Sequence, residues 1–131
     1  MDVALRNRTY ALFVQLGRAP RPEELGDRDE VLAGWSALHD GHALVLTADR
    51  KRLRMANPFS AVPTAYRVRA HGRWWYANCG WDCYGIAAAL GERPQFEASC
   101  ADCGGPITQD DAPFFQVQVP AAHWWDDIGF T

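Results

Sequence analysis

Four cysteines lie close together in the second half of the chain, and they constrain its fold and chemistry more than any other feature. They are Cys79, Cys83, Cys100 and Cys103, in a sequence of 131 residues. The N-terminus lacks the basic-then-apolar order of a secretion signal, and no apolar run approaches the ~18 residues that a membrane helix needs. In a cytosolic chain, clustered cysteines indicate metal-binding, redox or catalytic roles rather than disulfides. We therefore expect a cytoplasmic protein, with no membrane partner, whose chemistry lies at these cysteines.

The residues before Cys79 predict a β-hairpin, and those after it predict a helix. Residues 64–69 alternate as a strand does, His71-Gly72 forms a tight turn, and residues 73–77 return as a second strand. Residues 81–90 have the composition of a helix that ends at Gly91. Further along the chain we expect a strand over 96–99, a glycine-rich turn over 100–105, a strand over 114–119 and a packed aromatic tail over 123–131. Cys79 is thus predicted at a strand-to-helix junction.

The N-terminal part predicts three helices followed by a hairpin. Apolar residues in 4–16 recur at helical spacing, a short helix follows Pro22, and a third helix runs from Asp29. Residues 42–55 then read as two short strands joined by a polar turn. A proline-punctuated connector begins at position 57. We therefore predict an α+β protein with a winged-helix-like subdomain over residues 1–56, packed on an antiparallel-sheet subdomain with flanking helices over residues 57–131.

A winged helix invites a DNA-binding hypothesis, in which the basic side chains of the hairpin contact phosphates. Those side chains are Arg50, Lys51, Arg52 and Arg54. The preceding helices, however, carry mainly acidic residues, and the whole chain has a net charge of −3. An acidic recognition region repels the phosphates that it must approach. We favour a structural role for the hairpin, keep a winged-helix regulator as a lesser alternative, and do not expect nucleic acid as a partner.

Cys79 and Asp82 form a candidate catalytic pair. The free N–H groups of a first helical turn favour a thiolate, so a cysteine at that point is a nucleophile or a soft-metal ligand with a lowered pKa. Asp82 belongs to the same first turn and can face the same pocket. The sulfur can hold a soft electrophile, and the neighbouring carboxyl group can move a proton. The two residues together therefore form a candidate reaction centre. The competing interpretation is an inert buried cysteine followed by a favourable first-turn acid.

The four cysteines also allow a non-catalytic zinc-binding module. The segment from Cys100 to Gly105 has the Cys-x2-Cys-Gly pattern of a zinc knuckle. Together with Cys79 and Cys83, it would complete a four-thiolate zinc site. The Cys-x3-Cys spacing of the first pair is not the usual knuckle spacing, so zinc stays an alternative cofactor.

The residues around Cys79 resemble the core of the organomercurial (alkylmercury) lyase family. The family's Tyr-Ala-x-Cys-x-x-Asp signature, which follows a strand, corresponds to residues 76–82. The segment from Ala98 to Ile107 resembles the family's later Ser-x-Cys and Gly-x-Pro stretch. The family's winged-helix-like N-terminal subdomain, which is not known for DNA binding, corresponds to residues 4–56.

The resemblance implies a mechanism and a set of site residues. A cysteine thiolate, Cys79 by position, binds the mercury of an organomercurial; a second thiolate joins it; and the aspartate, Asp82, protonates the leaving carbon. No cofactor is required, and the expected partners are organomercury compounds or Hg(II) and small-molecule thiols. The family's second catalytic cysteine lies in a late segment that corresponds to residues 129–131, whereas no cysteine follows Cys103. Cys83 and Cys100 are therefore the candidate additional mercury ligands.

Overall fold

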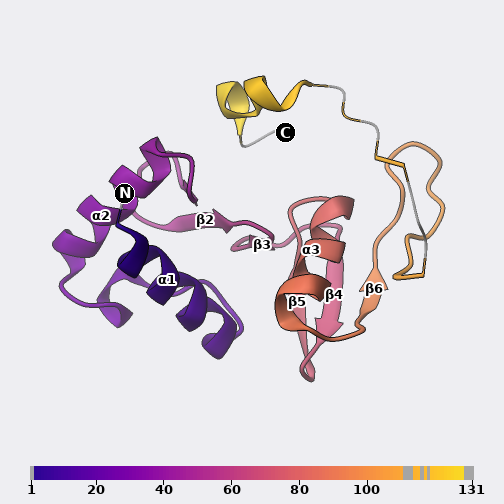
Figure 1. The fold of residues 1–131 in the computed structure, drawn as a ribbon, viewed down its shortest axis with the longest axis horizontal. Coiled ribbons are helices and arrows are strands. Elements are labelled where there is room, and N and C mark those ends of the chain that lie inside the picture. Colours follow the sequence, from indigo (N-terminus) through magenta and orange to yellow (C-terminus); the bar gives the residue numbers. More distant parts are fainter. Residues whose placement is uncertain (1, 111–113, 116, 118, 129–131) are drawn as a thin grey trace.

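A computed structural model describes residues 2–110, 114–115, 117 and 119–128 of the chain. Helices and antiparallel sheets succeed one another along it, so the fold is α+β, as the sequence predicts (Figure 1). In chain order the elements are α1 (Val3–Leu16), the 3₁₀ helix η1 (Pro22–Glu24), α2 (Arg28–Asp40), β1 (Val45–Leu46), β2 (Leu53–Ala56), β3 (Phe59–Ser60), β4 (Arg67–Ala70), β5 (Arg73–Tyr76), α3 (Gly80–Leu90), β6 (Gln95–Glu97) and the 3₁₀ helix η2 (Ala121–Asp127). Within the described ranges, no helix is long and apolar enough to span a bilayer.

Helices α1 and α2 are joined by a buried hydrogen-bond relay. The Thr9 hydroxyl donates to the Leu5 carbonyl at 2.8 Å and accepts from the Trp35 indole N–H at 2.9 Å. The buried Thr9 hydroxyl and Trp35 indole N–H therefore both have partners, which removes the cost of burying them. The relay fixes how the two helices cross at the N-terminal end of the molecule.

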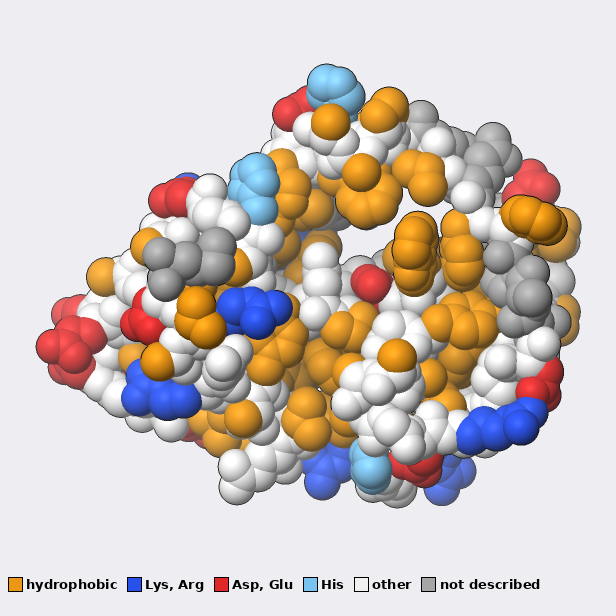
Figure 2. Space-filling model, in the orientation of Figure 1, with side chains coloured by type: hydrophobic (Ala, Val, Ile, Leu, Met, Phe, Trp, Pro, Cys, Tyr) orange, Lys and Arg blue, Asp and Glu red, His pale blue; other side chains and the backbone are white. Residues whose placement is uncertain are grey.

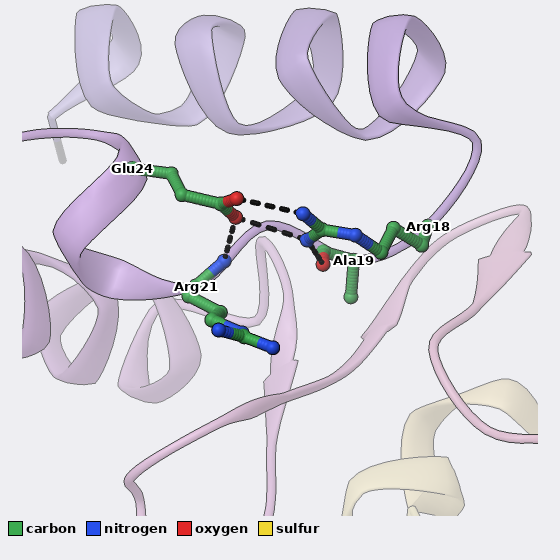
Figure 3. Close-up of polar contacts among 4 residues, drawn as sticks. All are labelled: Arg18, Ala19, Arg21 and Glu24. Atoms are coloured by element: carbon green, nitrogen blue, oxygen red, sulfur yellow. Dashed lines mark hydrogen bonds and ion pairs between the residues drawn. The ribbon is translucent and has the colours of Figure 1, made fainter.

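The helix predicted after Pro22 is a single 3₁₀ turn, held by Glu24. Its carboxylate accepts two hydrogen bonds from the Arg18 guanidinium, at 2.7 and 3.0 Å, and one from the Arg21 backbone N–H at 2.7 Å (Figure 3). The hydrogen bond from Arg18 is the main reason that the pKa of Glu24 falls to about 2. The expected short second helix is thus present as a single 3₁₀ turn, whose preceding Arg21 N–H is satisfied by the Glu24 carboxylate.

The hairpin predicted over residues 42–55 is present, and it belongs to a three-stranded antiparallel sheet of order β1-β2-β3. Its turn contains Arg50, whose guanidinium donates to the Ser36 hydroxyl at 2.6 Å and to the Asp40 carboxylate at 2.8 Å. Arg50 therefore fastens the hairpin to α2, as expected if the hairpin is a structural edge.

The second sheet has the order β5-β4-β6 and is antiparallel throughout. The predicted turn between β4 and β5 is confirmed: His71 and Gly72 both adopt left-handed backbone angles, with φ of 52° and 73°. Such angles match the twist of a two-residue hairpin. Strand β6 covers 95–97 instead of the predicted 96–99.

The strand predicted over residues 114–119 is not found in the described part of that segment. Residues 114, 115, 117 and 119 have no strand conformation, and residues 116 and 118 lie outside the described ranges. The alternating sequence pattern is thus not sufficient for a strand here, and the sheet of β4, β5 and β6 contains no fourth strand among the described residues.

Phe59 connects the two halves of the chain through one hydrophobic core. Its ring centroid lies 5.3 Å from that of Phe13 in α1 and 5.3 Å from that of Trp75 in β5. Phe59 also forms an isolated antiparallel bridge with Ala77, which follows β5. Because a single core runs through both sheets and all three α-helices, the N-terminal part directly borders the region of Cys79.

The C-terminal segment returns across the molecule, and η2 lies beside the N-terminal helices (Figure 1). Trp125 stacks on the imidazole of His42, with ring centroids 4.0 Å apart, and meets His39 edge-on. In the described part of the predicted packed tail, Trp124, Trp125 and Ile128 are half-buried, whereas His123, Asp126 and Asp127 are exposed, so the prediction is met only in part. Residues 129–131 are outside the described ranges. Figure 2 shows an opening, bordered by many hydrophobic side chains, below this returning segment.

Candidate functional site

Cys79 lies where β5 gives way to α3. The Ala77 backbone N–H donates to the Tyr66 carbonyl at 2.9 Å, which keeps the chain paired almost up to the helix. Cys79 is the N-cap residue, with extended backbone angles (φ −149°, ψ −178°), and its side chain makes no capping hydrogen bond. The predicted strand-to-helix junction is confirmed. Cys79 is exposed and its thiol is free, so a ligand can reach the sulfur.

The prediction that the helix N-terminus lowers the pKa of Cys79 is wrong for the free protein. Backbone N–H groups of Asp82 and Trp81 do favour the thiolate. Desolvation by surrounding protein atoms has the larger effect, and the negative charge of Asp82 adds to it, so the pKa of Cys79 is raised. At neutral pH Cys79 is therefore a thiol that must lose its proton when it binds a metal.

Asp82 stands in the first turn of α3 and is half-buried. Desolvation by burial raises the pKa of its carboxyl group above the ordinary value, although hydrogen bonds from the Asn78 side chain and backbone oppose the rise. A carboxyl group with a raised pKa holds a proton more readily than an ordinary aspartate does. The negative charge of Asp82 also disfavours the thiolate of Cys79, so the two groups are electrostatically linked.

Asn78 holds Asp82 in position. Its amide nitrogen donates to Asp82 Oδ2 at 2.9 Å, to Asn57 Oδ1 at 3.1 Å and to the Pro58 carbonyl at 3.3 Å. Three acceptors around one amide nitrogen leave no alternative orientation for that amide. Asn78 Oδ1 is buried, and no hydrogen-bond partner for it is found among the described residues. The connector at residue 57 is thus part of the site.

Helix α1 also reaches the site, through Tyr10. The Tyr10 hydroxyl donates to the Asn57 carbonyl at 3.1 Å, and the Arg6 guanidinium lies 4.8 Å from the centre of the tyrosine ring. Burial is the main cause of the raised pKa of Tyr10, and the negative charge of Asp82 contributes to it. The N-terminal part of the chain therefore supports the connector that positions Asn78.

Cys83 lies one helical turn after Cys79, and its thiol faces the core. The residue is fully buried, and its thiol donates weakly to the Cys79 carbonyl, with a sulfur-to-oxygen distance of 3.8 Å. Burial raises the pKa of Cys83 to about 12, and the nearby Cys79 and Asp82 contribute. The helical spacing does bring the two cysteines near each other, but it places Cys83 where ionisation is costly.

Cys100 and Cys103 lie together in a separate turn beyond β6. Both are free thiols, Cys100 half-buried and Cys103 exposed. The structure does not bring the four cysteines together: within the described ranges, no group of three or more His, Cys, Asp or Glu side chains could hold a metal ion. The four-thiolate zinc site considered from the sequence is therefore not assembled here.

Close packing forms a wall beside the start of α3. A side chain at Gly80 would lie 3.1 Å from the Ile107 side chain and 3.8 Å from the rings of Tyr66 and Phe115. Phe115 stacks on Trp81 with ring centroids 5.3 Å apart. Tyr66 just before β4, Trp81 in α3 and two residues after β6 thus surround the position next to Cys79 with apolar surface.

The family model for alkylmercury lyase, MerB, matches residues 59–124. The chain belongs to the alkylmercury lyase family. The matched region contains Asn78, the Cys79–Asp82 pair and the Cys100–Cys103 turn, and it begins just after the connector residues Asn57 and Pro58 that contact Asn78.

One solved structure shares the fold of this alkylmercury lyase family member. It is described as the crystal structure of the mercury-bound form of MerB2, and it matches with a TM-score of 0.64 and 20% sequence identity. The alignment covers 82% of this chain and 55% of that one, so the chain spans about half the length of its structural neighbour. No curated protein matches the chain significantly.

Sequence reasoning found Cys79 and Asp82 but missed the residues that hold them in place. Asn78 could have been found, since it precedes Cys79 and lies four residues before Asp82, a spacing at which helical side chains meet. Asn57 and Tyr10 carry no such local signal, because each contacts the site only through long-range folding.

Proposed function

We propose that this protein binds organomercury compounds through Cys79 and cleaves their carbon–mercury bond by protonolysis, with Asp82 as the proton donor. Membership of the alkylmercury lyase family supports the substrate class. The observation that carries the proposal is the junction itself: an accessible thiol at the start of α3, beside a half-buried carboxyl group with a raised pKa.

The first step replaces a thiol proton by mercury. The Cys79 sulfur bonds to the mercury of R–Hg⁺ and its proton passes to the carboxylate of Asp82. Mercury is a soft cation that prefers sulfur to oxygen or nitrogen ligands, so the bond forms even though the free thiol has a raised pKa. The raised pKa of Asp82 suits it to hold the transferred proton.

The second step breaks the carbon–mercury bond. A second thiolate adds to the mercury and donates electron density to it, and Asp82 delivers its proton to the leaving carbon. The products are the hydrocarbon R–H and Hg(II) bound to two thiolates. We infer that a small-molecule thiol supplies the second sulfur, because burial disfavours the thiolate of Cys83. The chemistry requires no cofactor.

The test is incubation of the full chain with phenylmercury and excess small thiol, with benzene release measured by gas chromatography. Cys79→Ser replaces the soft sulfur with a hydroxyl, so both mercury binding and benzene release should be lost. Asp82→Asn keeps the size and the hydrogen bond from Asn78 but cannot donate an acidic proton. Binding should survive, while release falls by ~10²–10⁴-fold, the usual contribution of a positioned general acid.

Cys83→Ala is the matched control, because it removes a neighbouring thiol that we do not assign to the reaction. Mercury binding by equilibrium dialysis and circular dichroism should accompany each variant. If Cys79→Ser binds phenylmercury as tightly as the parent chain, the assignment of Cys79 is wrong. If Asp82→Asn releases benzene at the parental rate, Asp82 is not the proton donor.

A further inference from the structure

The turn that follows β6 is a closed structure with two thiols at its end. The Cys100 N–H donates to the Gly105 carbonyl at 2.8 Å, and the Gly104 N–H donates to the Cys100 carbonyl at 2.9 Å. Gly104 has a left-handed φ of 71°, which suits a glycine. Just before and after the turn, Ser99 pairs with Pro106 in an antiparallel bridge. The backbone therefore fixes both cysteines in one short loop.

The two thiols lie next to each other within this turn. The side chain of Cys103, together with the backbone N–H groups of Cys103 and Asp102, lies near the Cys100 sulfur and interacts with it. Both thiols are free. The turn therefore presents two neighbouring sulfurs to a ligand.

The surroundings of the pair leave it open to a ligand. Cys103 is exposed. A Cβ atom at position 105 would lie 3.4 Å from the Cys103 sulfur, so the glycine there leaves space beside that sulfur. No His, Cys, Asp or Glu among the described residues joins the pair as a third ligand. The pair therefore offers two sulfurs and nothing else of metal-binding type.

We propose that Cys100 and Cys103 form a second thiolate site, separate from Cys79, which binds Hg(II) between two sulfurs. The choice of ion rests on the proposed function, which releases Hg(II). Two sulfurs suffice for this soft ion, whereas structural zinc takes four ligands. Binding exchanges two S–H bonds for two S–Hg bonds and releases two protons to solvent, with no change of oxidation state.

Chelation distinguishes this site from a single thiol. After one sulfur binds, the other acts at a high effective concentration, of millimolar order or above for short connections. A free monothiol must therefore be in large excess to remove the ion. Cys79 has no comparable partner, because the thiol nearest to it, Cys83, is buried and has a pKa raised to about 12.

The experiment uses the full chain carrying Cys79→Ser, so that the proposed catalytic thiol cannot contribute. The protein is loaded with HgCl₂, dialysed against glutathione in small molar excess, and analysed for bound mercury and for the ultraviolet absorption of sulfur–mercury bonds. We expect Cys79→Ser to retain mercury, and the added change Cys103→Ser or Cys100→Ser to lower retention at least tenfold. Adding Cys83→Ala instead is the matched control and should leave retention unchanged. Circular dichroism checks that each variant is folded.

Two results would overturn this proposal. In one, the Cys79→Ser protein retains no mercury under these conditions. In the other, adding Cys103→Ser or Cys100→Ser to it leaves the retained mercury unchanged. Zinc chloride in a parallel dialysis should not be retained; zinc held in preference to mercury would also refute it. Because the probe is inorganic Hg(II) and the readout is retention, the outcome is independent of hydrocarbon release. A protein that holds mercury at this pair but releases no benzene contradicts only the proposed function.

Discussion

At the scale of single residues, the site is governed by competition between desolvation and hydrogen bonding. At Cys79, two backbone N–H groups favour the thiolate, yet loss of water outweighs them. At Asp82, the hydrogen bonds from Asn78 lower the pKa, and burial again has the larger effect. At Cys100 the pKa is lowered, because the backbone N–H groups of Cys103 and Asp102 have a larger effect than desolvation. Position at the start of a helix does not by itself determine the charge of a cysteine.

The raised pKa of Asp82 has a consequence for stability. Folding at a pH above this pKa forces a charged carboxylate into a poorly hydrated place, which costs free energy; below the ordinary carboxyl pKa the group is neutral in both states and the cost vanishes. The contribution of Asp82 to stability therefore falls as the pH rises from the ordinary carboxyl range through its raised pKa. Asp82→Asn, which is always neutral, should raise the melting temperature at pH 7 and leave it unchanged at pH 3.

Thermal unfolding followed by circular dichroism at both pH values measures this effect. Asp102→Asn is the control, since that side chain is exposed and should show no such pH-dependent gain. A lower melting temperature for Asp82→Asn at pH 7 would show that the carboxylate is stabilising and that its pKa is not raised.

At the scale of elements, the position of Asp82 depends on how closely α3 approaches the connector before β3. Gly85 lies on the side of α3 that faces Pro58: a Cβ atom there would be 2.9 Å from the Pro58 Cβ. The Pro58 carbonyl accepts a hydrogen bond from Asn78. A glycine inside a helix costs about 1 kcal/mol relative to alanine. That cost is offset by a close approach that brings the connector, Asn78 and the first turn of α3 together.

Gly85→Ala should therefore destabilise the protein even though alanine is the better helix former. Overpacking of a tight contact costs typically ~1–3 kcal/mol, and the gain in helix propensity recovers only about 1 kcal/mol of it. Urea denaturation gives the change in the free energy of unfolding. Ala88→Gly, at an exposed position of the same helix, is the matched substitution and should lose about 1 kcal/mol through propensity alone. A more stable Gly85→Ala variant would show that α3 and Pro58 are not in close contact.

At the scale of the whole molecule, one aromatic side chain joins the N-terminal helices to the second sheet. Phe59 is 2% exposed and contacts both Phe13 and Trp75. The proposed boundary between residues 1–56 and 57–131 therefore passes beside a shared core. Tyr10 and the connector carry the same coupling into the site through hydrogen bonds.

Phe59→Ala should lower the free energy of unfolding by about 3–5 kcal/mol, the usual cost of deleting a buried phenylalanine ring. Because both halves use this ring, far-ultraviolet circular dichroism and tryptophan fluorescence should shift together along a urea gradient. Val62→Ala, at a partly exposed residue nearby, should change little. Two separate transitions, with only one of them displaced, would indicate that the two segments fold independently.

The sequence by itself determined the local features of this protein. Residue type and spacing predict three features that the structure confirms: the hairpin turn at His71-Gly72, the helix that ends at Gly91, and the position of Cys79 before that helix. The proximity of Cys79 to Asp82 follows equally, because both belong to one helical turn. The family signature could be read for the same reason: it is contained in seven consecutive residues, Tyr76 to Asp82.

Only the tertiary structure decided which side chains lose water and which distant segments meet. Burial in the core gives Cys83 its raised pKa, and desolvation reverses the shift expected at Cys79. The support that Asn57 and Tyr10 give to Asn78 has no trace in local spacing. The strand expected over 114–119 is missing from the described residues there, so an alternating pattern alone does not determine whether a segment pairs with a sheet. Spacing along the chain specifies neighbours within one element, whereas solvation and long-range contacts depend on how all the elements pack.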